Sequence, residues 1–237
     1  MGGGRGWGVG AGDNATRVKR YFADYTASDS LYARNLAALY SVGKDYGRSA
    51  DMDADLSAIT VEAAPQGHLN LCERQDGNER WLYDSDPREG AERSGQQFDF
   101  GIEGVVVLLG LGLGYLAHTV LSKLQRGHSL VICEADPRVF HAAMFHQDLT
   151  AILNDSRVHL VVGDDLNRLD FVLGRVSKTM FAADKMHTVR CSASVKWNKP
   201  QYDRFVERVK DRMKVLEINR NTIGNLGPRM LKNTLEN

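Results

Sequence analysis

Apolar and polar positions follow different periods along the chain, and these periods predict its elements. Residues 105–109 form an uninterrupted apolar run, as in a strand buried on both faces of a parallel sheet. Shorter apolar runs at residues 130–133 and 158–162 predict two more such strands. Helical patterns at residues 115–125 and 137–148 separate the three runs. The alternation predicts an α/β fold, a Rossmann-like parallel sheet flanked by helices and joined by right-handed crossovers.

The segment before this unit predicts an N-terminal helical and β-hairpin extension. In residues 14–46 apolar side chains recur at the spacing of helix faces. In residues 59–83 the period shortens to two, and turn signals at residues 65–67 and 76–78 interrupt it. This pattern is typical of an antiparallel hairpin or meander. Pro87 suits the first position of a short helix that follows.

The pattern weakens beyond the third predicted strand. Residues 166–173 favour a helix, and residues 179–183 and 188–195 favour two further strands. Residues 200–216 favour a good amphipathic helix with apolar side chains on one side and with a continuation toward Asn221. Residues 222–237 contain glycines and a proline but no clear stop, and we expect the natural chain to continue into a further domain.

These patterns divide the chain into four expected parts. A glycine-rich tail, expected to be disordered, comes first, and the helical and β-hairpin extension follows it. The Rossmann-like domain comes next, and a helical segment leads to the further domain. In the same order, the four parts occupy residues 1–13, 14–100, 101–200 and 201–237.

Composition and charge exclude several classes of function. Lys and Arg number 30, Asp and Glu also number 30, and the formal net charge is zero, so we expect no nucleic-acid partner. No apolar run reaches about 18 residues, so we expect no membrane partner. The N-terminus lacks the apolar core of a signal peptide, which favours a cytoplasmic location.

The three cysteines are far apart and lack metal-ligand spacing, so we expect free thiols and no metal site.

The candidate chemistry lies at the ends of the three predicted strands. Gly110, Gly112 and Gly114 separate the first strand from a helix, where backbone N–H groups and the helix dipole can meet an anionic ligand. Glu134 ends the second strand, where an acidic residue hydrogen-bonds ribose hydroxyls in such folds. Asp164 ends the third strand, where a carboxylate could meet a base. Together these residues predict a nucleotide-type ligand.

The spacing of the glycines narrows the choice of ligand. A dinucleotide fingerprint requires a small residue where this chain has Tyr115, so NAD is disfavoured. The G-x-G-x-G spacing, with Glu134 and Asp136 after the next strand, resembles S-adenosylmethionine-dependent methyltransferases and spermidine synthase-like proteins. The resemblance implies S-adenosylmethionine or a related nucleotide as cofactor. This chain differs from the methyltransferase pattern at Leu108, where methyltransferases usually carry an acidic residue. The glycines could instead serve only tight packing between strand and helix.

A longer series of motifs extends over most of the chain. In their order, these motifs resemble the N-terminal region of the Maf family, motility accessory factors regarded as flagellin glycosyltransferases. The resemblance implies transfer of nonulosonic acids from CMP-sugars to Ser or Thr of flagellin by a domain absent here. No catalytic residue is implied, because the family's transferase motif has no match in this sequence. The motifs are LYDSDPRE at residues 82–89, LGLGLGY at 109–115, ICEADP at 132–137, DSRVHLVVG at 155–163, NTI at 221–223 and NTLEN at 233–237.

Three functions follow from these patterns. The first is an N-terminal domain of a Maf-like glycosyltransferase, which binds a nucleotide or a partner such as flagellin without performing chemistry itself. The second is a methyltransferase that uses S-adenosylmethionine. The third is a non-catalytic protein-interaction module. A Rossmann-like fold alone does not decide between them, because such sheets carry many activities.

Overall fold

The structure is a computed structural model, and it describes residues 30–41, 54–177 and 186–235. The tail at residues 1–13 and the strand expected at residues 179–183 lie outside the described residues. The division into four parts stays a prediction.

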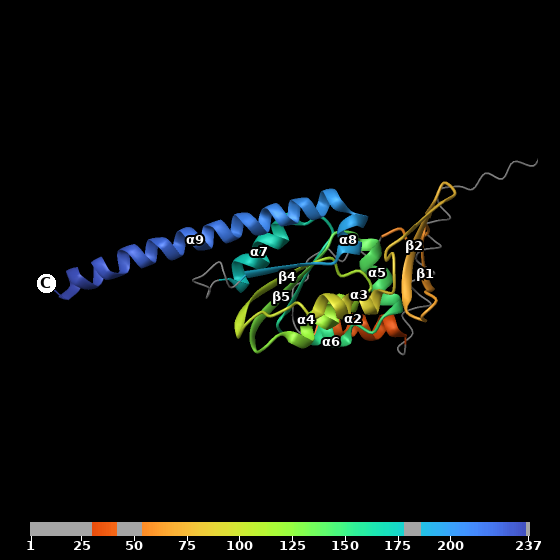
Figure 1. Cartoon of the computed structure of the whole chain (residues 1–237), viewed down its shortest axis with the longest axis horizontal. Helices are drawn as coiled ribbons and strands as arrows, with labels where there is room; N and C mark the ends of the chain where they lie inside the picture. Colours follow the sequence, from red (N-terminus) through yellow and green to blue (C-terminus); the bar gives the residue numbers. More distant parts are fainter. Residues whose placement is uncertain (1–29, 42–53, 178–185, 236–237) are drawn as a thin grey trace, which may run out of the picture.

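A four-stranded parallel sheet forms the centre of the molecule (Figure 1). In spatial order its strands are β6 (Val158–Val162), β5 (Gly127–Glu134), β4 (Glu103–Leu109) and β7 (Met186–Arg190). Every pairing between neighbours is parallel, so all four strands end at the same edge of the sheet. The three strands predicted from apolar runs are β4, β5 and β6, and the Rossmann-like α/β fold class is confirmed.

An antiparallel sheet precedes the parallel sheet in the chain. Its strands β1 (Ile59–Ala63), β2 (Leu69–Gln75) and β3 (Asn78–Trp81) pair in chain order. Between β2 and β3, Asp76 and Gly77 have φ angles of 52° and 79°, as a two-residue hairpin turn of type I′ requires. The meander predicted from the period of two is therefore confirmed.

Two helices among the described residues also belong to the extension. The helix α2 (Leu31–Ser41) is the described part of the helical pattern predicted over residues 14–46. The helix α3 (Pro87–Gly95) starts with its proline, as predicted, because proline fixes a helical φ and needs no N–H partner there. The Asp86 side chain caps α3 by accepting a hydrogen bond from the Glu89 backbone N–H at 2.7 Å.

Helices cover both faces of the parallel sheet (Figure 1). On one face lie α4 (Tyr115–Lys123), α5 (Pro137–His146) and α6 (Thr150–Asn154), with α2 and α3 beside them. On the other face lie α7 (Leu166–Val176) and α9 (Lys199–Leu235). The sheet is therefore the middle of three layers, and each face has its own apolar core.

The strand β4 shows why the apolar run is continuous. Val106 and Leu108 belong to the core under α4 and α5, whereas Val105, Val107 and Leu109 belong to the core under α7 and α9. Successive side chains of a strand point to opposite faces, and here both faces are covered. A polar residue at any of these positions would be buried.

Residues 188–195, predicted as one strand, contain a strand end and a helix start, so that prediction was wrong. The strand β7 ends at Arg190, and α8 (Ser192–Trp197) begins two residues later. The Cys191 N–H donates to the Leu109 carbonyl at 2.8 Å, at the last residue of β4. Beyond this point β4 offers no further partner, so the chain leaves the sheet and forms a helix.

The helix α9 is much longer than predicted. The sequence favoured a helix over residues 200–216 with a continuation toward Asn221, but α9 has 37 residues and includes Gly224, Gly227 and Pro228. Glycine and proline usually mark helix ends, which explains the shorter prediction. Figure 1 shows α9 running along the sheet and then well beyond it. Neither α9 nor any other described helix combines the length and the apolar character that crossing a membrane requires.

A buried asparagine connects α2 to the parallel-sheet domain. The Asn35 side chain donates to the carbonyls of Met144 and Gln147 at 2.8 and 2.7 Å, and it accepts from the Leu149 N–H at 2.9 Å. These contacts satisfy the backbone at the point where α5 ends. They also explain why the helix predicted over residues 137–148 stops at His146 and gives way to α6.

Replacing Asn35 with Ala should lower the free energy of unfolding by about 2–3 kcal/mol, because buried carbonyls and an N–H group lose their partner. Urea denaturation of the purified chain measures this change. The matched control on the same helix is Ser41→Ala. The Ser41 hydroxyl makes an exposed contact with Asn154, so its loss should cost less than about 0.5 kcal/mol. Equal effects of the two variants would contradict the structural role of Asn35.

Candidate functional site

The predicted nucleotide site lies at the carboxyl edge of the parallel sheet, where residues 110–114 connect β4 to α4. We call this segment the glycine turn. Gly110, Gly112 and Gly114 have φ angles of 97°, 55° and 88°. All three values are in the left-handed region, where a side chain causes strain. The backbone conformation therefore requires glycine at each of these positions.

Side chains of the protein itself fill the space next to each glycine. A Cβ atom at Gly110 would lie 2.4 Å from the Ser194 Cβ of α8. At Gly112 it would lie 2.3 Å from the Tyr83 hydroxyl oxygen. At Gly114 it would lie 2.7 Å from a methyl group of Leu149. The glycines thus allow close approach of the chain's own residues.

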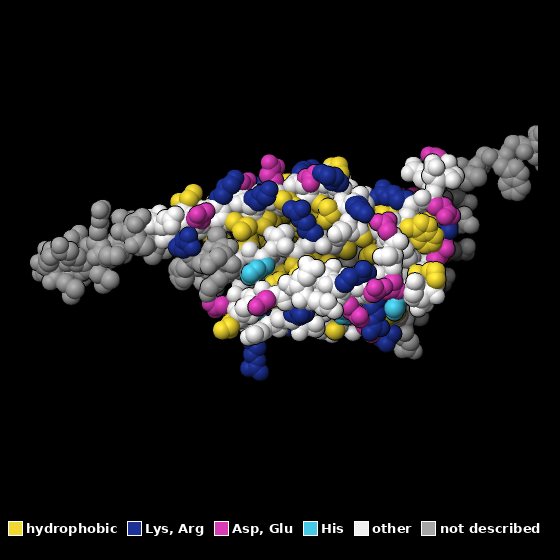
Figure 2. All heavy atoms as spheres, in the orientation of Figure 1, with side chains coloured by type: hydrophobic (Ala, Val, Ile, Leu, Met, Phe, Trp, Pro, Cys, Tyr) yellow, Lys and Arg dark blue, Asp and Glu magenta, His cyan; other side chains and the backbone are white. Residues whose placement is uncertain are grey.

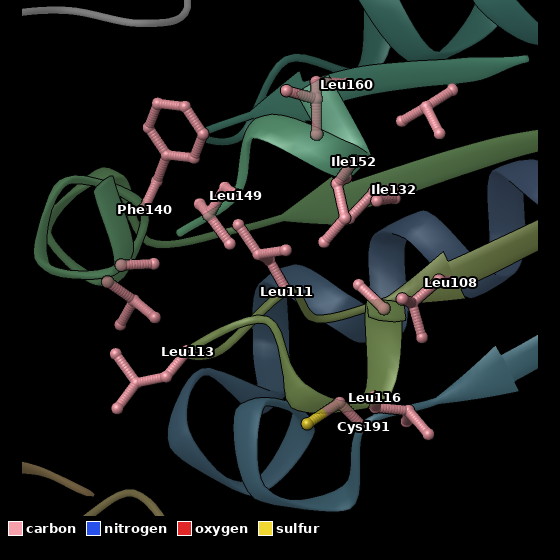
Figure 3. Packing of buried hydrophobic residues seen from close by; sticks show 14 of the residues in the cluster. Leu108, Leu111, Leu113, Leu116, Ile132, Phe140, Leu149, Ile152, Leu160 and Cys191 are labelled. Atoms are coloured by element: carbon pink, nitrogen blue, oxygen red, sulfur yellow. The ribbon is translucent and has the colours of Figure 1, made fainter. Parts of the chain in front are cut away.

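The residues between the glycines belong to the apolar core. Leu111 and Leu113 are each only 1% exposed. Figure 3 shows Leu111 among the side chains of Leu149, Ile132 and Ile152. A turn that presents its backbone to a ligand does not need large apolar side chains at these positions. Here the glycine turn contributes to the core between the sheet and its helices.

Each backbone N–H of the glycine turn has a partner within the protein. The Leu111 and Gly112 N–H groups donate to one oxygen of the Glu134 carboxylate at 2.9 and 3.0 Å. The Leu113 N–H donates to the Tyr83 hydroxyl at 2.9 Å. The Gly110 and Gly114 N–H groups donate to backbone carbonyls at 2.8 and 2.9 Å. In this arrangement the turn has no N–H group to offer a phosphate or a carboxylate.

Glu134 ends β5 as predicted, and its side chain is buried against the glycine turn. The second carboxylate oxygen accepts from the Asp136 N–H at 3.1 Å and from the Tyr202 hydroxyl at 2.8 Å. Burial raises the pKa of the Glu134 carboxyl from its ordinary 4.5 to about 7, and the surrounding donors partly oppose this effect. All described contacts of this carboxylate are thus with the protein.

Asp136 lies beside Glu134 and is also satisfied internally. Both of its carboxylate oxygens accept a hydrogen bond from the Arg138 guanidinium, at 3.0 and 2.7 Å. One of them also accepts from the Trp197 ring N–H at 3.3 Å. It also caps α5 through the Arg138 backbone N–H at 2.9 Å. Burial alone would raise the pKa of Asp136, but the hydrogen bonds and charge of Arg138 lower it overall.

Asp164 is exposed and has a different surrounding. Its carboxylate forms an ion pair with Arg204 of α9, and Asp170 of α7 pairs with Arg208 at 3.5 Å. On the face drawn in Figure 2, basic and acidic side chains are interspersed in the same manner. The structure therefore brings Gly110, Gly112, Glu134 and Asp136 together, whereas Asp164 faces α9.

Other residues complete the surroundings of the glycine turn, and no sequence pattern linked them to the glycines, although Tyr83 lies in the LYDSDPRE motif at residues 82–89. Tyr83 follows the antiparallel sheet, Ser194 and Trp197 belong to α8, and Tyr202 belongs to α9. Each comes from a segment outside the predicted strand–turn–helix unit. Only the fold places them at this edge, since no spacing in the sequence relates them to the glycines.

Metal and thiol chemistry find no support at this site. Among the described residues, no three His, Cys, Asp or Glu side chains lie close enough to hold a metal ion. The three cysteines were predicted to be free thiols, and all three are buried. Burial raises the pKa of the Cys133 and Cys191 thiols, so neither is activated as a nucleophile.

The residues at this edge do not fit S-adenosylmethionine or a related nucleotide in the described arrangement. The carboxylate expected to bind ribose accepts hydrogen bonds from the glycine turn instead. Leu108, which stands at a position usually acidic in methyltransferases, is fully buried in the sheet. The predicted roles of the glycines, Glu134, Asp136 and Asp164 in ligand binding stay predictions.

The fold and this edge define a Rossmann-like α/β domain with an N-terminal antiparallel sheet, and comparisons with known proteins relate it to a family. Residues 100–178 match the model of the glycosyltransferase Maf N-terminal domain. This segment runs from before β4 to the end of α7. The predicted resemblance to the N-terminal region of the Maf family is therefore confirmed.

Solved structures give a consistent result for the fold. The chain is similar to the Maf glycosyltransferase from Magnetospirillum magneticum AMB-1, with a TM-score of 0.56 and 14% identity over 78% of this chain and 35% of that one. It thus spans about a third of that protein. Fibrillarin from Aeropyrum pernix, solved with S-adenosylmethionine, has a TM-score of only 0.27 and 14% identity over 65% of this chain and 84% of that one. No curated protein matches the sequence.

Replacing Glu134 with Gln should change how stability depends on pH. A pKa of about 7 in the folded chain, above the ordinary 4.5, means that the folded state keeps a proton that the unfolded state has lost. The contribution of Glu134 to stability is thus complete below pH 4.5 and is lost as pH rises through about 7. Measured relative to Glu134→Gln, the wild type should become less stable between pH 5 and pH 8 by roughly 1–3 kcal/mol.

Urea denaturation at several pH values in this range tests the expectation. The exposed Glu217 of α9 provides the control, because Glu217→Gln should leave the pH dependence of the wild type in place. A constant difference in stability between wild type and Glu134→Gln at all pH values would show that folding does not shift the pKa of Glu134.

Proposed function

We propose that the chain is the accessory N-terminal region of a Maf-like flagellin glycosyltransferase. The observation that carries this proposal is the match of residues 100–178 to the Maf N-terminal domain. The similarity of fold to a Maf glycosyltransferase, of which the chain spans 35%, supports it. In this proposal, nonulosonic acid passes from a CMP-sugar to Ser or Thr of flagellin in a part of the transferase other than this region.

The geometry of the glycine turn supports an accessory role over a catalytic one. The buried Glu134 and Asp136 carboxylates are fully engaged with the protein. The cysteines are buried thiols of raised pKa, and the turn has no N–H group directed at a substrate. A methyltransferase needs a cofactor site at this edge, so this alternative has less support. A cytoplasmic location is part of the proposal, and buried free thiols are compatible with a reducing compartment.

Flagellin is the partner that this proposal assigns. In cells that encode the chain, deletion of its gene should remove nonulosonic acid from flagellin, which intact-protein mass spectrometry detects as a lower mass. Restoring the gene should restore the mass. An unchanged flagellin mass after deletion would exclude the proposal, and loss of methyl groups alone would favour a methyltransferase.

A reconstitution with purified components tests the accessory role separately. Flagellin incubated with a CMP-nonulosonic acid and the 237-residue chain alone should keep its mass, because the carboxylates of Glu134 and Asp136 at the glycine turn are bound by the protein's own donors. Transfer by the chain alone would show that the chemistry resides in these residues. The matched reaction with S-adenosylmethionine should likewise leave the mass unchanged.

A further inference from the structure

We propose that the glycine turn binds the chain's own Tyr83 in place of a cofactor, and that it serves as the attachment point of the β1–β3 sheet. This inference concerns the described residues alone. It goes beyond the accessory function proposed above, because it assigns a structural ligand to the site where the sequence predicts a nucleotide.

The Tyr83 hydroxyl makes the central contact. It accepts a hydrogen bond from the Leu113 N–H at 2.9 Å and occupies the space that a Cβ at Gly112 would need. The residue as a whole is partly exposed, whereas burial at its hydroxyl raises the pKa of Tyr83 well above its ordinary value. The absence of a side chain at Gly112 thus provides room for a phenol oxygen.

Tyr83 is held on the antiparallel sheet by Asn70 of β2. The Asn70 side chain donates to the Tyr83 carbonyl at 2.8 Å and accepts from the Tyr83 N–H at 3.1 Å. Asn70 is buried, so both bonds are shielded from water. The position of Tyr83 is therefore fixed relative to β2, and its contact with the glycine turn fixes β2 relative to the parallel sheet.

Two further contacts join the same elements. The Tyr115 hydroxyl accepts from the Leu69 N–H at 2.9 Å and donates to the Leu69 carbonyl at 3.2 Å. Arg138 of α5 pairs with Glu73 of β2 at 2.8 Å. Tyr115 is the large residue that departs from the dinucleotide fingerprint. The structure gives it a different purpose, because it connects the start of α4 to the first residue of β2.

The attached sheet and a nucleotide compete for the same atoms. A phosphate or carboxylate at the glycine turn would have to displace the Tyr83 hydroxyl from Leu113 and the Glu134 carboxylate from Leu111 and Gly112. One oxygen of the buried Glu134 carboxylate would then lose both of its donors, which is costly in a low-dielectric interior. Binding of a cofactor is therefore excluded while the antiparallel sheet is attached.

A double-mutant cycle on the purified 237-residue chain tests the contact. Gly112→Ala should lower the urea midpoint, because the new methyl group meets the Tyr83 hydroxyl and the φ of 55° is unfavourable for alanine. In a Tyr83→Phe background the hydroxyl is absent, so Gly112→Ala should lower the urea midpoint by a smaller amount. The matched control is Gly114→Ala. Gly114 also has a positive φ, of 88°, but its new methyl group would meet Leu149 rather than Tyr83. Gly114→Ala should therefore lower the urea midpoint equally in the wild-type and the Tyr83→Phe backgrounds.

Two direct measurements complete the test. Tyr83→Phe should speed hydrogen exchange of the Leu113 amide by roughly fivefold, the effect of losing one hydrogen bond. Calorimetric titration of the wild type with S-adenosylmethionine, S-adenosylhomocysteine, CMP and NAD should show no binding. Additive effects in the cycle, unchanged exchange at Leu113, or micromolar binding of any of the four compounds would each overturn the proposal. None of these results depends on flagellin, so this inference and the proposed function can fail separately.

Discussion

Two backbone N–H groups of the glycine turn donate hydrogen bonds to one oxygen of the buried Glu134 carboxylate. Its other oxygen accepts a hydrogen bond from the Tyr202 hydroxyl of α9. A carboxylate in the interior is stable only when donors surround it, so the turn, the end of β5 and α9 must keep their relative positions. The positive φ angles of the glycines and the burial of Leu111 belong to this arrangement. The edge of the sheet that holds cofactors in related folds is here a centre of packing.

Most of the fold was predictable because its causes are local. The apolar run of β4, the Asp76–Gly77 turn and Pro87 at the start of α3 each follow from the residues at those positions. Two of the errors have tertiary causes. The chain leaves the sheet after β7 because β4 ends, and α5 stops early because Asn35, far away in the sequence, binds Gln147 and Leu149 of the backbone that follows it.

The candidate site shows the same division between local and distant causes. The strand–turn–helix unit and the position of Glu134 at the end of β5 were predictable from spacing. The direction of the Glu134 side chain was not, because its partners Gly112 and Tyr202 are brought to it by the fold. Glycines that receive a ligand and glycines that receive a side chain of the same protein have the same sequence pattern. The positions of Ser194, Tyr83 and Leu149, which the fold sets, separate the two cases here.

The helix α9 turns a small rotation at one end into a large displacement at the other. Its 37 residues correspond to about 55 Å at the rise of an α-helix. Tyr202, Phe205 and Val209 fix its first half to the sheet, and its second half extends beyond it (Figure 1). A tilt of about 5° at the fixed half would move the far end by roughly 4 Å, since a helix bends little over this length. The packing of α9 from Tyr202 to Leu216 therefore sets the direction in which its far end points.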